Sequence, residues 1–206
     1  FGAGDGFKTQ ILIEHFLEEN INFHYLPVDI SSEILNYLTD TLNNKYPDLN
    51  IDGINDDYFA ALHKLREKDR FTRNIVLFLG SNIGNFDTPD AIHFLTTLRN
   101  ELRKDDLVLM GFDLKKNPKI IADAYNDNNN ITAEFNLNLL DRINSEYDGN
   151  FERDNFVHHP LYDPVSGRAK SFLVSLKNHT VTLKKLNIKI NFKTAEPIYT
   201  EISQKY

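Results

Sequence analysis

Three stretches near the start of the chain have residue types and spacing suited to a nucleotide-like cofactor. The chain opens FGAGDGFKTQ, and Gly2, Gly4 and Gly6 permit positive φ and close backbone approach. The apolar helix expected at 8–19 presents unpaired N–H groups at its start, which suit a carboxylate or a phosphate. A tight turn between a strand and a helix, without any ligand, explains the glycines about equally well.

Two further acidic positions follow the next expected strands. Asp29 ends the stretch NFHYLPVDI, where a carboxylate can accept hydrogen bonds from both hydroxyls of a ribose. In NDDYF, at 55–59, an Asp can accept from an adenine amine while the next aromatic packs on the ring. Taken singly, Asp56 or Asp57 is more often the N-cap of a helix. All three features in order favour an adenosine-binding site.

The glycine spacing separates two classes of cofactor. A dinucleotide fingerprint requires a third glycine at position 7, where this chain has Phe7. The observed pattern, G-x-G-x-G, weighs against an NAD-dependent oxidoreductase. A non-catalytic cofactor-binding domain remains an alternative.

The elements that must position these residues alternate in type. Strands are predicted at 22–30, 49–54, 74–86 and 107–114, and the last two have apolar runs typical of strands buried on both faces. Helices are predicted at 8–19, 31–47, 57–68 and 88–104, with Ser31 and Thr88 as N-caps. This order predicts an α/β fold with a doubly wound parallel sheet over 1–114. Helices at 117–127 and 131–147 and antiparallel hairpins then predict a second lobe over 115–206.

Composition narrows the class of partner. The 206 residues include no cysteine, which excludes disulfides, thiolate nucleophiles and thiolate metal sites. A formal net charge of −7 argues against nucleic acid, and the longest apolar runs are too short to cross a membrane. His158 and His159 are adjacent on an expected strand and point to opposite faces, so we expect no metal site. We expect a cytoplasmic protein with a small-molecule partner.

Several longer motifs resemble one family closely. FLGSNIGNF, FDLKKNP, AYND, ITAEFNLNLLDRIN and IYTEISQKY occur in the order and spacing of the histidine-specific Nα-methyltransferases of ergothioneine biosynthesis. The resemblance covers essentially the whole chain. It implies a class I methyltransferase (Rossmann-like) fold, S-adenosylmethionine as cofactor and an added lobe that recognises the acceptor. The implied reaction is methylation of the α-amine of an amino acid, L-histidine above all, to the trimethylated betaine.

The resemblance also implies the site residues. The implied cofactor contacts are Gly2, Lys8, Asp29, Asp57 and Tyr58. The implied acceptor pocket contains Asn85 and Tyr125, which hold the substrate carboxylate, and Glu201 and Ser203, which face the imidazole. The chemistry agrees, because an amide and a phenol can donate to a carboxylate. Glu201 and Ser203 are two residues apart, so an extended strand directs both side chains to one face.

The chain departs from the family pattern in two respects. Ser171 stands where the pattern has a Met beside the acceptor side chain, so the pocket here is expected to be more polar or roomier, and another amino acid such as tryptophan is an alternative acceptor. Both ends are expected to be truncated, and the full-length protein is expected to be a monomer. No residue has a compelling spacing for a general base.

Overall fold

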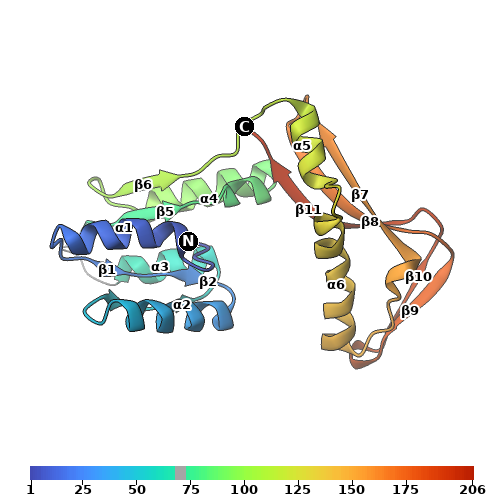
Figure 1. The fold of residues 1–206 in the computed structure, drawn as a ribbon, viewed down its shortest axis with the longest axis horizontal. Coiled ribbons are helices and arrows are strands. Elements are labelled where there is room, and N and C mark those ends of the chain that lie inside the picture. The colour runs from blue at the N-terminus through green and yellow to red at the C-terminus, as the bar shows by residue number, and fades with distance from the viewer. Residues whose placement is uncertain (68–72) are drawn as a thin grey trace. The chain divides into compact units, whose positions relative to one another are not determined.

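The computed structural model describes residues 1–67 and 73–206, which form two compact units that we describe separately (Figure 1). Unit 1 comprises Phe1–Ile83 and Thr88–Gly111. Unit 2 comprises Gly84–Asp87 and Phe112–Tyr206. The short segment Gly84–Asp87 therefore belongs to unit 2, although the chain on either side of it belongs to unit 1.

The helices of unit 1 follow the predicted pattern. They are α1 (Phe7–Glu18), α2 (Ser32–Lys45), α3 (Tyr58–Glu67) and α4 (Thr88–Glu101). Ser31 caps α2 as predicted, because its Oγ accepts a hydrogen bond from the Ile34 amide at 3.3 Å. Thr88 is the first helical residue of α4 rather than the residue before it. The expected end of the third helix at Lys68 lies outside the described residues.

The strands of unit 1 are short and pair in parallel. They are β1 (His24–Tyr25), β2 (Val28–Asp29), β3 (Asn50–Ile51), β4 (Ile54–Asn55), β5 (Ile75–Phe78) and β6 (Leu107–Met110). The pairs are β1 with β3, β2 with β4, and β5 with β6. The strand expected over 22–30 is divided into β1 and β2 because Pro27 between them has no N–H to donate. The α/β class is confirmed, with parallel strands alternating with helices.

The expectation that the strands at 74–86 and 107–114 are buried on both faces is wrong for β6 and only half right for β5. Leu107, Val108 and Leu109 are 50%, 42% and 52% exposed, and so is Ile75 at the start of β5 at 52%. Only β5 pairs with β6 in the described ranges, so β6 is an edge strand. Apolar runs of this kind predict a strand correctly, but burial depends on the neighbours that the strand finds.

A groove of about 540 Å³ lies in unit 1 between the strand pair that contains β2 and the strand pair that contains β5. The Phe78 carbonyl accepts from Gly111, beyond the end of β6, at 2.9 Å, whereas the Leu77 carbonyl faces the other way and accepts from the Phe1 amine at 2.8 Å. On the β2 side, the Val28 carbonyl accepts from the Ala3 amide at 3.0 Å. Residues 1–3 thus bridge the two strand pairs at one end of the groove.

Unit 2 is a mixed helix and antiparallel lobe. Its helices are α5 (Pro118–Tyr125) and α6 (Ile131–Tyr147), and its strands are β7 (Phe156–Asp163), β8 (Arg168–Ser175), β9 (His179–Leu183), β10 (Ile188–Phe192) and β11 (Pro197–Gln204). One antiparallel sheet has the order β11-β8-β7, and β9 and β10 form a separate hairpin. None of the helices in the described ranges combines the length and apolar character needed to cross a bilayer.

One face of the three-stranded sheet is buried and becomes polar toward β11. Burial alternates along β8, where Ala169, Ser171, Leu173 and Ser175 are the buried residues. Leu140 of α6 packs against Leu173 in the main core of the unit. Since directly paired residues share a face, the pairings of β11 with β8 place polar side chains on this same face.

Candidate functional site

The glycine-rich turn of unit 1 has the backbone conformation that its glycines predict. Gly2, Gly4 and Gly6 have φ of 65°, 52° and 67°. A Cβ at Gly2 would lie 2.6 Å from Asn82 Nδ2 and 3.0 Å from the Tyr58 hydroxyl, whereas a Cβ at Gly4 would meet nothing within 4 Å. The turn therefore passes tightly over Asn82 at Gly2 and is open above Gly4, as a backbone cradle for a ligand requires.

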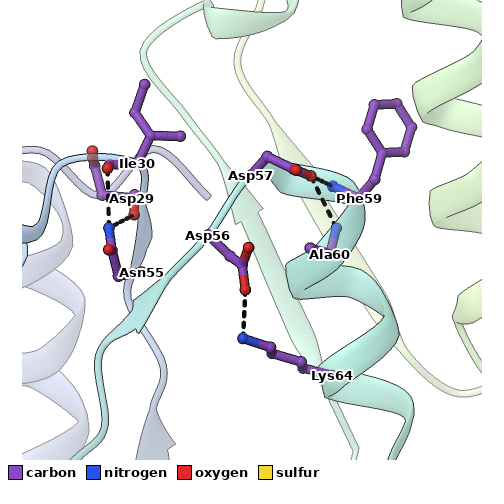
Figure 2. Close-up of polar contacts among 8 residues, drawn as sticks. All are labelled: Asp29, Ile30, Asn55, Asp56, Asp57, Phe59, Ala60 and Lys64. Carbon is purple, nitrogen blue, oxygen red and sulfur yellow. Dashed lines mark hydrogen bonds and ion pairs between the residues drawn. The ribbon is translucent and has the colours of Figure 1, made fainter.

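Asp29 lies at the end of β2 and holds the turn in place. Its Oδ2 accepts a hydrogen bond from the Gly4 amide and its Oδ1 accepts one from the Ser31 amide, both at 3.0 Å. On the backbone side, Asn55 Nδ2 donates to the Asp29 and Ile30 carbonyls at 3.0 Å each (Figure 2). A carboxylate oxygen can accept more than one hydrogen bond, so Asp29 retains capacity for two ligand hydroxyls.

Asp57 and Tyr58 are adjacent but face different surroundings. Asp57 Oδ1 accepts from the Phe59 and Ala60 amides at 2.8 and 3.0 Å, so Asp57 is the N-cap of α3 (Figure 2). The Tyr58 ring packs edge-on against Phe78 at a centroid distance of 5.3 Å, and burial, with the charge of Asp29, raises the pKa of its phenol. The ring of Tyr58 is thus occupied by core packing, and its hydroxyl faces Gly2.

Lys8 completes the set of unit 1 residues predicted from the sequence. It is exposed in the first turn of α1, and a Cβ at Gly80 would lie 3.6 Å from its Nζ. Gly2, Lys8, Gly80 and Asn82 all line the groove of unit 1. Asn82 was not singled out from the sequence, but a polar residue just beyond the carboxyl end of a parallel strand is the signal that could have found it.

Glu201, Ser203 and Ser171, three of the residues expected at the acceptor, lie on the buried face of the sheet in unit 2. Glu201 pairs with Ser171 across β11 and β8, and Ser203 pairs with Ala169. Ser171 Oγ donates to Glu201 Oε2 at 3.4 Å, and Ser171 and Ser203 are 0% and 8% exposed. The shared face predicted for Glu201 and Ser203 is therefore present. A β-bulge at Thr200 precedes them, where the pairing skips one residue of β11.

Glu201 also lines a cavity of about 510 Å³ in unit 2. Asn85 lines it as well, so the structure brings together one residue expected at the substrate carboxylate and one expected at the ring. Arg142 and the buried Asn136, both on α6, line the same cavity. Arg142 and Asn136 were missed by sequence reasoning, because an Arg and an Asn on an amphipathic helix are usually solvated.

Tyr125 does not line this cavity but meets Ser203 through a lysine. Lys205 Nζ donates to the Ser203 hydroxyl at 2.9 Å and to the Tyr125 hydroxyl at 3.1 Å. Its third partner is Asp113 Oδ2 at 2.8 Å. Lys205 was not singled out from the sequence.

His158 lies on β7, and its Nε2 is buried without a hydrogen-bond partner among the described residues. Burial lowers the pKa of His158, and the nearby Glu201 carboxylate opposes this shift. His158 thus lies on the buried sheet face beside its pairing partner Leu173, and burial there favours the neutral ring.

Comparison with known proteins decides the family. The sequence model of a family described as "Histidine-specific methyltransferase, SAM-dependent" matches residues 1–206. The chain belongs to this family. A histidine N-alpha-methyltransferase of Mycolicibacterium smegmatis is 29% identical over 205 residues, which are 100% of this chain and 63% of that protein. The chain thus spans less than two thirds of the length of this methyltransferase.

Two further proteins are similar to this member of the family. The ergothioneine biosynthesis protein 1 of Schizosaccharomyces pombe is 30% identical over 214 residues, covering 99% of this chain and 27% of that protein. A solved S-adenosylmethionine-dependent methyltransferase from Clostridium acetobutylicum aligns with 100% of this chain and 65% of its own, with a TM-score of 0.44 and 9% identity.

Proposed function

We propose that the protein is an S-adenosylmethionine-dependent N-methyltransferase that methylates the α-amine of L-histidine, giving the trimethylated betaine after three transfers. The observation that carries this proposal is the match of the histidine-specific methyltransferase family over residues 1–206. The similarity to a histidine N-alpha-methyltransferase and to an ergothioneine biosynthesis protein supports the same acceptor.

The residues of unit 1 fit the cofactor. The turn over Gly2 and Gly4 leaves the open backbone cradle described above, Lys8 supplies a cation for a carboxylate, and Asp29 has acceptor capacity for two ribose hydroxyls. Asp57 caps α3 through Oδ1 alone, which leaves Oδ2 for an adenine amine. We assign Tyr58 a contact through its hydroxyl, since its ring is packed in the core.

The residues of unit 2 are assigned to the amino acid. Asn85 and Tyr125 donate to its carboxylate, and Glu201 and Ser203 meet the two nitrogens of the imidazole. Ser171 shapes this pocket, because its small side chain is fully buried beside Glu201. We accordingly assign 1–114 to cofactor binding and 115–206 to acceptor recognition, with Asn85 as an acceptor residue carried in the first range.

In methyl transfer the main task of the protein is to position the amine relative to the methyl group. S-adenosylmethionine, when bound, supplies a methyl group activated on a sulfonium sulfur. Holding the amine for in-line attack supplies proximity worth up to roughly 7–11 kcal/mol. The amine must be neutral to attack, and we assign removal of its proton to solvent. We further propose a cytoplasmic monomer without a nucleic-acid partner, which the net charge of −7 supports.

Mass spectrometry tests the reaction directly. The full-length protein is incubated with methyl-labelled cofactor and a panel of free amino acids that includes histidine and tryptophan. We expect labelled mono-, di- and trimethylated histidine as the main products. Preferential labelling of tryptophan would replace the acceptor but keep the enzyme class. Binding of S-adenosylhomocysteine with no labelled product from the panel would favour a non-catalytic cofactor-binding protein.

The double variant Glu201→Ala/Ser203→Ala tests the ring site. Because the imidazole nitrogens would then be desolvated without partners, histidine turnover should fall by roughly one to four powers of ten. The ratio of activity on amino acids with apolar rings to activity on histidine should rise. Lys170→Ala, on the opposite face of the same sheet, is the control and should retain wild-type turnover. Wild-type kcat/KM for histidine in the double variant would remove these residues from recognition.

A further inference from the structure

The ammonium group of Lys205 is buried in unit 2 and is not used by the chemistry described above. Lys205 is 5% exposed, and an ammonium has three N–H donors and no acceptor. The three hydrogen bonds described above, to Asp113, Ser203 and Tyr125, use all of them. A buried lysine so fully coordinated is a fixed part of the site rather than a solvated side chain.

The Asp113–Lys205 pair is charged. Burial lowers the pKa of Lys205, but its hydrogen bonds to Asp113 and Tyr125 outweigh this effect, and the net pKa is raised. The hydrogen bond from Lys205 in turn lowers the pKa of Asp113. A permanent positive charge therefore lies within 3.1 Å of both the Tyr125 and the Ser203 oxygens.

This contact determines which way the two hydroxyls can point. Since Lys205 can only donate, the Tyr125 and Ser203 oxygens must accept from it. Their own hydrogens are then directed elsewhere, and neither hydroxyl donates to any other group in the described ranges. Two O–H donors are thus left for a ligand.

We propose that Lys205 is a positioning residue that makes Tyr125 and Ser203 hydrogen-bond donors toward the acceptor, so that the site takes the amino acid with a neutral imidazole ring. This inference rests on the proposed function. Tyr125 donates to a carboxylate oxygen, Ser203 donates to the unprotonated ring nitrogen, and Glu201 accepts from the ring N–H.

A cationic ring fits this arrangement less well. An imidazolium has an N–H on both nitrogens and needs two acceptors, but the Ser203 oxygen already accepts from Lys205 at 2.9 Å. The Lys205 charge is balanced by Asp113 at 2.8 Å, and the Glu201 carboxylate would attract a cationic ring, so the missing acceptor at Ser203 is what disfavours the imidazolium. Of Glu201 and Ser203, only Glu201 can accept, so one ring nitrogen is matched in each protonation state and the other only in the neutral state.

The test compares two ligands on the full-length protein with S-adenosylhomocysteine bound. Calorimetry measures the Kd of L-histidine and of 3-(1,2,4-triazol-3-yl)-L-alanine, whose ring stays uncharged, at about pH 5 and about pH 8. The ratio of the two Kd values cancels titration of the α-amine and of the protein. With a ring pKa of about 6.5, histidine should weaken roughly 30-fold relative to the triazole at the lower pH. An unchanged ratio, or a ratio that favours histidine at low pH, would overturn the proposal.

Lys205→Met and Lys116→Met form a matched pair of variants. Both remove a cation from Asp113, which also accepts from Lys116 at 3.2 Å, but only Lys205 contacts the two hydroxyls. Lys205→Met should weaken histidine binding roughly tenfold or more and reduce the 30-fold pH effect to a few-fold. Lys116→Met should leave both unchanged. A pH effect of wild-type size in a folded Lys205→Met variant would assign Lys205 a structural role only.

Failure of this inference is distinguishable from failure of the proposed function. If the wild-type protein methylates histidine but the ratio of Kd values is independent of pH, only the positioning role is lost. If the wild-type protein binds and methylates neither ligand, the acceptor assignment itself is wrong, and the positioning role falls with it.

Discussion

A single carboxylate can hold the backbone and a ligand together, and Asp29 is placed to do both. We expect Asp29→Ala to weaken S-adenosylhomocysteine binding about 10- to 150-fold, because hydrogen bonds to charged groups contribute roughly 1.5–3 kcal/mol. The variant also leaves the Gly4 and Ser31 amides without their partner, so its Tm should fall. Calorimetric titration and thermal unfolding measure the two effects separately.

Asp106 provides the control for this prediction. It also accepts from two backbone amides of unit 1, those of Asn74 at 2.8 Å and Arg103 at 2.9 Å, but no cofactor role is assigned to it. Asp106→Ala should therefore lower the Tm and keep the affinity. Equal losses of affinity in both variants would mean that Asp29 acts only through the fold.

Predictability differs from residue to residue. Alternation along a strand is enough to place Glu201 and Ser203 on one face, and the structure has them there. The same alternation puts Lys205 on that face, yet a lysine is normally solvated, and only contact with Asp113 and Tyr125 explains its burial. Such partners lie far apart in sequence, so local patterns do not reveal them.

At the scale of an element, the N-terminus of α6 is not capped by the side chain of the residue that precedes the helix. Asn130 is left-handed and makes no side-chain cap, and Asp127 takes its place by accepting from the Ile131 and Thr132 amides, both at 2.8 Å. These backbone hydrogen bonds lower the pKa of Asp127 to about 2, and the one from Thr132 has the largest effect. The folded state thus favours the ionised carboxylate.

Asp127→Ala should lower the Tm at neutral pH by a few degrees. Because the folded pKa of Asp127 lies below the unfolded one, its contribution is complete above about pH 4 and is lost as the pH falls through about 2. The difference in Tm between wild type and variant should shrink over that window. Asp123→Ala, which removes an exposed ion pair with Lys119, is the control and should change little. A difference independent of pH would contradict the charged cap.

Helices were predicted better than strands for a physical reason. The period of apolar residues fixed α6 at its observed bounds, and the Ser31 cap marked the start of α2. Strand length and burial depend on partners along the whole sheet, which a local pattern does not contain. Pro27 was visible in the sequence, but its division of one expected strand into β1 and β2 follows from the ladder bond that it cannot make.

At the scale of the molecule, the strand edges on either side of the groove in unit 1 are the part of the described structure most prone to pair with other chains. No strand covers these edges in the described ranges, and such edges pair readily with other chains. We expect a protein of just these 206 residues to associate with increasing concentration, which light scattering measures. Leu77→Pro removes an N–H that faces the groove and should weaken association by roughly tenfold.

Val76→Pro is the counterpart of this change. Because backbone groups alternate in direction, the N–H of Val76 faces β6 rather than the groove. Val76→Pro should lower the Tm by breaking the β5 ladder, whereas Leu77→Pro should nearly keep it. A monomer at all concentrations, or equal association of wild type and Leu77→Pro, would show that the groove edges do not recruit strands.

The division of the chain into units has a consequence for recombination. The proposed acceptor residues all lie in unit 2, but that unit is encoded in two separate stretches, because Gly84–Asp87 belongs to it. A single crossover between 111 and 112 would exchange Tyr125, Ser171, Glu201 and Ser203 and leave Asn85 with its former partner. To transfer all the proposed acceptor residues, a chimaera must also exchange Gly84–Asp87. A chimaera with a single junction would combine acceptor residues from two different parents.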